Sequence, residues 1–160
     1  MITAILLNPV LEKICKIDSL CHGKKAICNE DIETPFGSGI VIARVAKVLG
    51  KDVLVCGFIG QLIGDIIEKE LQQEGIHTYF TKIGDCSRRV VTIIEANKKQ
   101  QAMIVDPSPY VSEQELLRFE KELNPHIEES DIIIIGGSLP KGVPTNFYAR
   151  LIKNLNGKKN

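Results

Sequence analysis

The stretch Asp131-Ile132-Ile133-Ile134-Ile135-Gly136-Gly137 decides the class of fold. Consecutive isoleucines between an aspartate and a glycine pair are typical of a strand buried on both faces, because β-branched residues favour strands and no position is polar. The apolar runs 2–7 and 52–59 have the same character. Each run is followed, at once or after an insertion, by a helical pattern. The sequence therefore predicts crossover units and a mainly parallel sheet, an α/β fold.

The first predicted helix follows a glycine-rich turn. It is expected to begin with Ser38 as its N-cap and to end at Gly50. Its inward face is predicted to carry Val41, Val45 and Val48. The charged residues fall on another face and are interpreted as solvated: Arg44, Lys47 and Lys51.

Three further helices are expected. The second spans about 62–74 and turns its isoleucines and Leu71 inward. The third has the clearest start, since Ser112 and Glu115 have the spacing of a capping box and the residues that follow keep helical spacing to Ile127. The fourth begins near Pro144 and is expected to carry Phe147, Leu151 and Ile152.

Two regions, about 12–34 and 88–104, interrupt this alternation of strand and helix. Both are charged and rich in β-branched residues, and the second contains a break at Asn97-Lys98-Lys99. These features predict exposed strands or hairpins that form a small sheet standing off the main one.

Composition limits the classes of function. The chain has 160 residues, and its 20 basic and 20 acidic side chains give no net charge, so no basic field for binding nucleic acid is expected. The five cysteines are odd in number and lack metal-site spacing, as is typical of reduced thiols in a cytoplasm. Neither a signal peptide nor a membrane-spanning run is recognised. We expect a cytoplasmic domain that binds neither nucleic acid nor membrane.

The turn Phe36-Gly37-Ser38-Gly39-Ile40 is typical of an anion-binding loop before a helix, although such a turn is often only a turn. A dinucleotide fingerprint requires a glycine or alanine where Ile42 stands, and an acidic residue at the end of the next strand. A Walker loop occurs nowhere in the sequence. The stretch is therefore predicted not to be a nucleotide loop.

Taken in order, the motifs of the chain resemble those of the PfkB family of carbohydrate kinases, in the branch of 1-phosphofructokinase and tagatose-6-phosphate kinase. The resemblance covers the whole chain. The motifs that carry it are Leu7-Asn8-Pro9-Val10-Leu11-Glu12, Pro35-Phe36-Gly37-Ser38-Gly39-Ile40, Ala43-Arg44-Val45, Gly57-Phe58-Ile59-Gly60, Ser87-Arg88-Arg89-Val90-Val91-Thr92-Ile93, Asp106-Pro107-Ser108-Pro109 and Gly137-Ser138-Leu139-Pro140-Lys141-Gly142-Val143-Pro144.

The resemblance implies a three-layer, ribokinase-like α/β domain with a projecting β-sheet lid. It implies a kinase that uses ATP and Mg²⁺ to phosphorylate a ketohexose phosphate, such as fructose-1-phosphate or tagatose-6-phosphate. It also implies a sugar-phosphate site, with no metal ligand assigned in this chain, formed by Glu12, Gly37, Ser38, Gly39, Arg88 and Ser138. Arg88 is expected to bind the phosphate, the alternative being surface charge on an exposed strand. Glu12 is expected to bind sugar hydroxyls, the alternative being a solvated lid carboxylate.

The sequence departs from the family pattern in the sugar loop. The pattern Gly-Gly-Lys-Gly-Ile-Asn is here Phe36-Gly37-Ser38-Gly39-Ile40-Val41, so a lysine and an asparagine that bond the substrate are replaced. Val90 and Thr92 replace two further polar residues. Each lost polar contact costs about 1–3 kcal/mol of binding free energy.

The family's Gly-Ala-Gly-Asp segment, which supplies the anion hole and the catalytic base, does not occur in the sequence. The chain is therefore interpreted as the N-terminal half of such a kinase, with no activity expected from it alone. The alternative is a non-catalytic sugar-phosphate-binding or interaction module. In either case we expect a homo-oligomer formed through the lid or through an exposed sheet edge.

Overall fold

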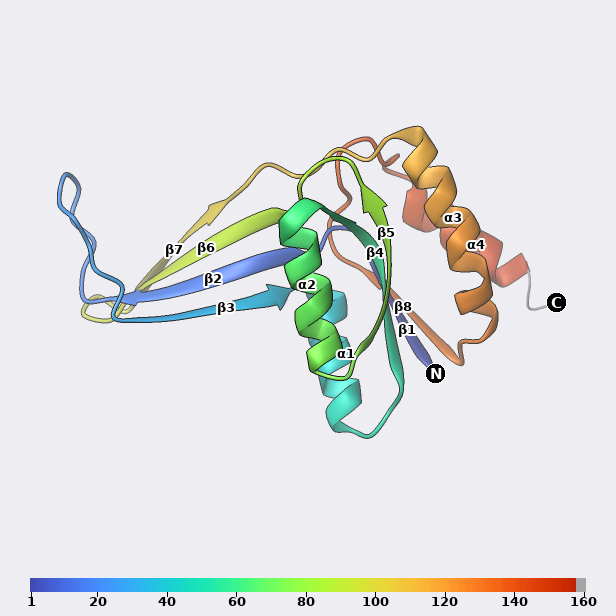
Figure 1. Ribbon diagram of the computed structural model, residues 1–160, viewed down its shortest axis with the longest axis horizontal. Coiled ribbons are helices and arrows are strands. Elements are labelled where there is room, and N and C mark those ends of the chain that lie inside the picture. The colour runs from blue at the N-terminus through green and yellow to red at the C-terminus, as the bar shows by residue number, and fades with distance from the viewer. Residues whose placement is uncertain (158–160) are drawn as a thin grey trace.

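The central sheet has four parallel strands in the order β5-β4-β1-β8 (Figure 1). The computed structural model describes residues 1–157. The strands are β1 (Ile2–Leu6), β4 (Val53–Gly60), β5 (His77–Ile83) and β8 (Ile132–Gly136). The three predicted strands are present, and the sequence pattern missed β5. β8 was expected to be buried on both faces, but within residues 1–157 it lies at an edge and is only partly buried.

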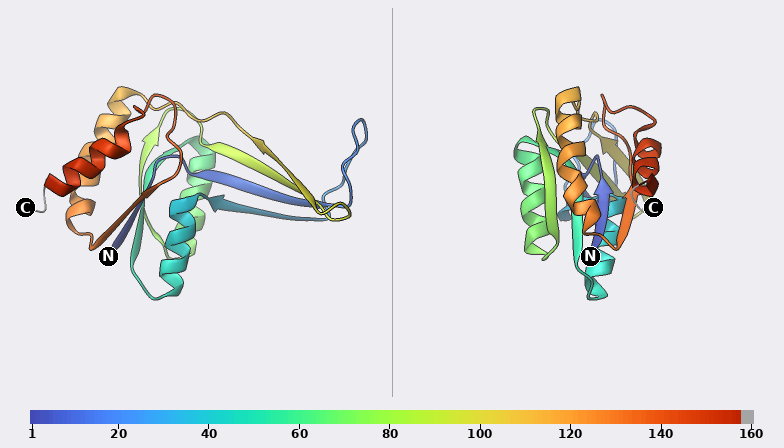
Figure 2. Two further views of the ribbon diagram at one scale, coloured as in Figure 1. Left: turned by 180° about the vertical axis from the view of Figure 1, so that it is seen from behind. Right: turned by 90° about the vertical axis from the view of Figure 1, so that its right-hand side faces the viewer.

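Helices cover both faces of this sheet and produce three layers (Figure 2). On one face lie α1 (Ser38–Val48) and α2 (Gln61–Gln73), and on the other lie α3 (Glu113–Glu128) and α4 (Phe147–Gly157). Side chains of α1 and α2 form one core with β1 and β4, and those of α3 and α4 form a second core with the opposite face. The expected three-layer α/β fold is confirmed.

The sequence assigned the wrong inward face to α1. Its buried residues are Gly39, Ile40, Ala43 and Ala46, whereas the three valines predicted to be inside are exposed. Small residues let the helix axis approach the sheet closely, which explains why the alanines and not the bulkier valines face inward. The N-cap is Gly37 and not Ser38, because the helix already begins at Ser38 and no side chain caps it.

The other helices agree better with the sequence. Ser112 and Glu115 form the predicted capping box of α3, and the apolar side chains expected to face inward are buried. In α2 the inward face is also as predicted. In α4, Phe147 is fully buried but Ile152 is exposed, so the inward face predicted for this helix was only partly right.

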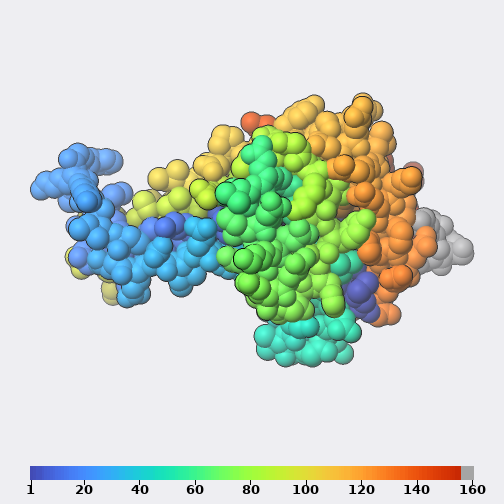
Figure 3. Space-filling view, viewed as in Figure 1, coloured from blue at the N-terminus to red at the C-terminus, as the bar shows by residue number. Residues whose placement is uncertain are grey.

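A second sheet projects from the body and forms the lid (Figures 1 and 3). Its strands, in the order β3-β2-β6-β7, are β2 (Val10–Ile17), β3 (Glu30–Phe36), β6 (Arg88–Glu95) and β7 (Gln100–Val105). β2 and β6 run parallel, and each pairs antiparallel with its outer neighbour. β2 follows β1 after a short turn, which brings the inner end of the lid to the carboxyl end of the central sheet.

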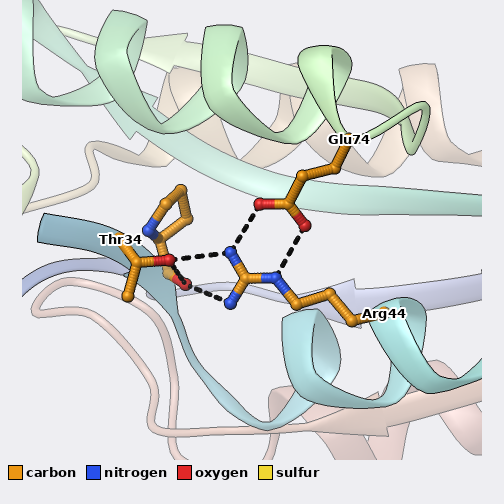
Figure 4. Close-up of polar contacts among 4 residues, drawn as sticks. Thr34, Arg44 and Glu74 are labelled. Carbon is orange, nitrogen blue, oxygen red and sulfur yellow. Dashed lines mark hydrogen bonds and ion pairs between the residues drawn. The ribbon is translucent and has the colours of Figure 1, made fainter. Parts of the chain in front are cut away.

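Arg44 joins the lid to the body (Figure 4). Its guanidinium donates to both carboxylate oxygens of Glu74, each at 2.7 Å, to the carbonyl oxygen of Pro35 at 2.9 Å and to the Thr34 hydroxyl at 2.9 Å. The interpretation of Arg44 as a solvated charge was therefore wrong. One side chain of α1 ties together the end of β3 and the turn that follows α2.

All five cysteines are free thiols. In the part of the chain that the structure describes, no helix is both long and apolar enough to cross a membrane.

Candidate functional site

A hollow of about 360 Å³ lies where the lid meets the body. It is at the carboxyl ends of β1 and β8 and at the start of α1, the position at which open parallel sheets bind ligands. Its volume is within the range of small-molecule pockets. Its lining residues come from both sheets: Leu6, Asn8, Val10, Glu12, Phe36, Gly37, Ser38, Arg88, Val90, Met103, Val105, Gly137 and Ser138.

Most of the residues that the resemblance placed in a substrate site lie in this hollow. Five of the six line it, although they come from separate parts of the sequence: Glu12, Gly37, Ser38, Arg88 and Ser138. Gly39 does not line it. Gly39 is buried beneath the loop, where an added Cβ would lie 2.9 Å from the Cβ of Leu6, so its role is to let α1 approach β1.

Two glycines shape the floor of the hollow around Leu6. Gly37 has φ of 145° and Gly137 has φ of 91°, backbone conformations that favour glycine. A Cβ at Gly37 would lie 2.7 Å from Leu6 Cδ2, and one at Gly137 would lie 2.6 Å from Leu6 Cδ1. The loop before α1 and the loop after β8 therefore lie directly against the end of β1. This contact brings the uncapped first amides of α1 to the wall of the hollow.

Arg88 is the cation of the hollow. It is the first residue of β6, and its Nη2 donates to the Ser138 hydroxyl at 3.0 Å. Its Nε is buried without a hydrogen-bond partner, and within residues 1–157 its guanidinium forms no salt bridge. Burial lowers the pKa of the guanidinium below its ordinary value. A partly desolvated arginine with an unused donor favours an anionic ligand.

The sequence reasoning did not assign Asn8 to the site. Its amide nitrogen donates to Ser108 at 2.9 Å and to Ser138 at 3.2 Å, and its Oδ1 is buried without a partner among the described residues. Asn8 is the second residue after β1 and is only 4% exposed. Its place at the carboxyl end of a central strand is the signal that could have identified it.

Glu12 is the carboxylate of the hollow, and it is not a solvated lid residue. It is 8% exposed and accepts a hydrogen bond of 2.5 Å from the Thr92 hydroxyl on the neighbouring strand. An ionised carboxylate can accept about four hydrogen bonds, so one partner leaves capacity for ligand hydroxyls.

The arrangement combines one cation, one carboxylate, hydroxyl and amide groups, and apolar walls. A cationic donor suits a phosphate, while the carboxylate and the asparagine oxygen can accept hydrogen bonds from hydroxyl groups. The hollow can therefore hold a small molecule that has both an anionic group and hydroxyl groups.

Comparison with protein families identifies the chain. The sequence model described as pfkB family carbohydrate kinase matches residues 13–159. The chain belongs to this family. Among curated pfkB relatives, it is 29% identical to the tagatose-6-phosphate kinase of Staphylococcus epidermidis strain RP62A over 153 residues, which are 96% of this chain and 49% of that protein.

Solved structures give the same fold. The structure of a possible 1-phosphofructokinase from Thermotoga maritima matches this chain with a TM-score of 0.91 and 24% identity. The match covers 99% of this chain and 51% of the Thermotoga maritima chain. Phosphofructokinase-2 from Escherichia coli, solved with fructose-6-phosphate, matches with a TM-score of 0.85 and 23% identity. This match covers 98% of the present chain and 51% of the Escherichia coli chain. The pfkB chain described here thus spans about half the length of the relatives it matches.

Kinases of the pfkB family generally use ATP and Mg²⁺. The donor set of the hollow does not by itself make up a magnesium site, because Mg²⁺ requires an octahedral set of oxygen ligands and Glu12 is the single carboxylate among the described residues that line the hollow. Among the described residues, no three His, Cys, Asp or Glu side chains are grouped to hold a metal ion.

Proposed function

We propose that the hollow is the sugar-phosphate half of a carbohydrate kinase site that serves the ATP-dependent phosphorylation of a ketohexose phosphate. Membership of the pfkB family supports the class of reaction. The relatives named for tagatose-6-phosphate and fructose-1-phosphate chemistry support the choice of substrate class. The observation that carries the proposal is Arg88, a guanidinium in the hollow that lacks an acidic partner in residues 1–157 and has a buried, unused Nε.

Each polar residue then has a separate role in binding. Arg88 binds the phosphate already on the sugar, and Ser138 keeps the guanidinium in place. Glu12 and the Oδ1 of Asn8 accept hydrogen bonds from sugar hydroxyls. The start of α1 adds backbone amides and the positive end of its dipole.

We expect no turnover by residues 1–160 alone. Phosphoryl transfer requires a positioned base for the attacking hydroxyl and groups that bind the transferred phosphate. Among the described residues, Glu12 is the one carboxylate that lines the hollow, and the Gly-Ala-Gly-Asp segment to which the family resemblance assigns the base does not occur in the sequence. ATP-dependent phosphorylation of fructose-1-phosphate or tagatose-6-phosphate by the purified chain would contradict this expectation.

A non-catalytic binding module is the second candidate. The observation that favours it is the sugar loop, where Phe36, Ser38 and Val41 stand in place of glycine, lysine and asparagine. These replacements lie inside the region that matches the relatives. The fact that the chain spans only half of the relatives' length therefore does not account for them. Phe36 lines the hollow, and Val41 points to solvent from α1, so the loop offers fewer donors than the family pattern.

Isothermal titration calorimetry tests the binding proposal. The wild-type chain is titrated with tagatose-6-phosphate, fructose-1-phosphate, unphosphorylated tagatose and inorganic phosphate. We expect the two sugar phosphates to bind in the micromolar range, and Arg88→Ala to weaken them by about 10- to 150-fold, since a charge-assisted hydrogen bond contributes about 1.5–3 kcal/mol. Arg89→Ala is the matched control, because Arg89 is exposed on the same strand and does not line the hollow.

The outcomes separate the candidates. If neither sugar phosphate binds, or if Arg88→Ala and Arg89→Ala weaken binding equally, the binding proposal is wrong. If the sugar phosphates bind as proposed, adding the C-terminal half of a related kinase decides between the two candidate functions. Restored ATP-dependent turnover supports a kinase half-site, and its absence supports a binding module.

The lid is the proposed surface for self-association. Its outer strands expose apolar side chains: Ile32, Met103 and Val105 lie on one face of the lid, and Ile104 lies on the other. Exposed apolar patches on strands are typical of protein interfaces. Phosphofructokinase-2 from Escherichia coli, which has the same fold, was solved in a tetrameric form, and this supports the proposal of an oligomer.

A further inference from the structure

The face of the lid that meets the hollow is mostly apolar. Residues that oppose one another in neighbouring strands share a face of the sheet, so the strand register identifies the members of this face. Its apolar members that line the hollow are Val10, Phe36, Val90, Met103 and Val105. In the inner half of the lid, the polar side chains on the same face are those of Glu12, Thr34, Arg88 and Thr92.

The register also sets the spacing of the two charged groups. Arg88 is opposite Val10, and Glu12 lies two residues farther along β2. Since a strand rises about 3.3 Å per residue, Arg88 and Glu12 are attached about 6–7 Å apart along the strands. Both line the hollow, and within residues 1–157 no salt bridge joins them. The hollow therefore presents a cation and a carboxylate at separate levels and not as a neutralised pair.

Thr92 is the residue that holds Glu12. It is opposite Ile14, one level farther out along the lid, and its hydroxyl donates to Oε1 of Glu12 at 2.5 Å. Both side chains are buried, but Glu12 lines the hollow and Thr92 does not. Any effect of Thr92 on a ligand must therefore pass through Glu12.

The other neighbours of Glu12 on this face do not compete for its carboxylate. Thr34, opposite Glu12 in β3, accepts from Arg44 at 2.9 Å and donates to the carbonyl oxygen of Pro35. Val90, opposite Glu12 in β6, is apolar. Oε2 of Glu12 has no hydrogen-bond partner among the described residues. The carboxylate is thus held at one oxygen, and the other is left for a ligand.

The neutral character of Thr92 preserves the charge of Glu12. A lysine or arginine partner would offset the negative charge, whereas a hydroxyl orients the carboxylate without doing so. Hydrogen bonds to a charged acceptor are roughly twice as strong as those between neutral groups. The family pattern has a different polar residue in place of Thr92, so the pair of Thr92 and Glu12 is a feature of this chain.

We propose that Thr92 is a positioning residue, which holds Oε1 of Glu12 so that Oε2 accepts a hydrogen bond from a sugar hydroxyl. This inference rests on the proposed function, in which Arg88 binds the phosphate of the same sugar. The ligand then needs hydroxyl groups about 6–7 Å from its phosphate, the separation set by the strands. A ketohexose phosphate has hydroxyl groups along its length, whereas methyl phosphate has none and can use only Arg88.

Three probes test the positioning role. Tagatose-6-phosphate and fructose-1-phosphate are titrated by calorimetry, and methyl phosphate is titrated by phosphorus NMR. Thr92→Val keeps the shape of the side chain and removes its hydroxyl, and it is expected to weaken both sugar phosphates about 5- to 10-fold. Methyl phosphate should bind as it does to the wild type. Thr92→Ser keeps the hydroxyl and should bind all three probes like the wild type.

Thr81→Val is the matched control. Thr81 is also buried, and its hydroxyl donates to Oε2 of Glu122 at 2.8 Å, so the substitution removes the same kind of bond away from the hollow. Urea denaturation should show similar losses of stability for the two valine variants, but Thr81→Val should leave sugar-phosphate binding unchanged. Equal weakening of binding by both variants would overturn the proposal, because a loss of stability would then explain it.

A double-mutant cycle separates positioning from an independent role of Thr92. In the Glu12→Ala background, Thr92→Val is expected to have no further effect on either sugar phosphate. The proposal is wrong if the effect persists there, or if Thr92→Val weakens methyl phosphate as much as the sugar phosphates. If Arg88→Ala weakens the sugar phosphates and Thr92→Val does not, the positioning role is refuted and the proposed function stands. If neither sugar phosphate binds the wild-type chain, both are refuted.

Discussion

The two edges of the central sheet are built differently. At the β5 edge, Arg118 of α3 donates to the backbone carbonyl of Lys82, and the Lys82 ammonium group bridges Asp65 and Glu68 of α2 at 2.8 Å each. At the β8 edge, four successive isoleucines meet no further strand within residues 1–157. Charged side chains at an edge strand prevent unwanted strand pairing. The chain therefore protects one edge with its own residues, and within residues 1–157 it leaves the other without such protection.

The same contrast occurs between the two sides of α1. The inner side carries Ile40 and two alanines in the core, and the flank toward α2 carries Arg44 in a network of hydrogen bonds. The outer side carries exposed apolar residues: Val41, Ile42, Val45 and Val48. A helix of this kind normally lies between two layers of protein, and only one layer is present in the described chain.

The largest expected effect separates the inner and outer sides of α1. Ile40→Ala removes a fully buried side chain and is expected to lower the free energy of unfolding by about 2–5 kcal/mol. Val45→Ala is its matched control, because Val45 is 55% exposed and its loss should change the free energy of unfolding by less than about 0.5 kcal/mol. Urea denaturation measures both. Equal losses would mean that the outer side is already packed in the isolated chain.

An intermediate effect is expected at the protected edge. Glu115 caps α3 through Ser112 and accepts from the amide of Gly84, just after β5. Partial burial raises the pKa of Glu115, but the hydrogen bonds from Ser112 and Gly84 outweigh it and hold the pKa below its ordinary value of 4.5. Because the folded-state pKa is the lower one, the stabilisation is present above pH 4.5 and is lost as the pH falls through the folded-state pKa.

Glu115→Ala should therefore lower the free energy of unfolding by about 1 kcal/mol at pH 7. The difference from the wild type should shrink as the pH falls below 4.5. Glu113→Ala, in the same helical turn but outside the capping box, is the control. Urea denaturation at a series of pH values measures the effect, and a difference that stays constant down to pH 3 would exclude the carboxylate as its source.

The smallest effect on stability is expected from two substitutions, one that adds a charged residue to the β8 edge and one that removes a charged residue from the β5 edge. Ile132→Lys gives β8 the kind of charge that protects β5, and Lys82→Ile removes that charge from β5. Ile132→Lys should change the free energy of unfolding by less than about 0.5 kcal/mol, since Ile132 is largely exposed. Light scattering during slow heating should show that it delays aggregation, whereas Lys82→Ile hastens it. The reverse order would mean that β5 and not β8 is the unprotected edge.

Local patterns were sufficient to predict much of the fold. The capping box at Ser112 and the apolar spacing after it identified α3, and the isoleucine run identified β8, because these signals depend on neighbouring residues. β5 was missed because an edge strand mixes polar and apolar positions, as in Thr78, Lys82 and Ile83. The inward face of α1 was misassigned because apolar residues lie almost all around the helix, so periodicity could not select one side.

The site was harder to predict than the fold. Arg88 and Glu12 were found through the resemblance, but their burial and hydrogen bonds depend on which strands pair in the lid. Asn8 became recognisable only when β1 was seen to end at the hollow. Arg44 looked like any helical surface charge, since its partners in β3 and after α2 are 9–30 residues away.

The junction at Arg44 determines how the lid can move. The guanidinium is held by Glu74 on one side and by Pro35 and Thr34 on the other, so these hydrogen bonds resist sliding of the inner end of β3 along α1 or α2. A ribbon fixed at its root closes by bending along its length and not by swinging on a hinge at the body. The loop between β2 and β3 then travels farthest, while Glu12, close to the root, stays nearly still. Bending of this kind would therefore leave the binding groups near the root in register.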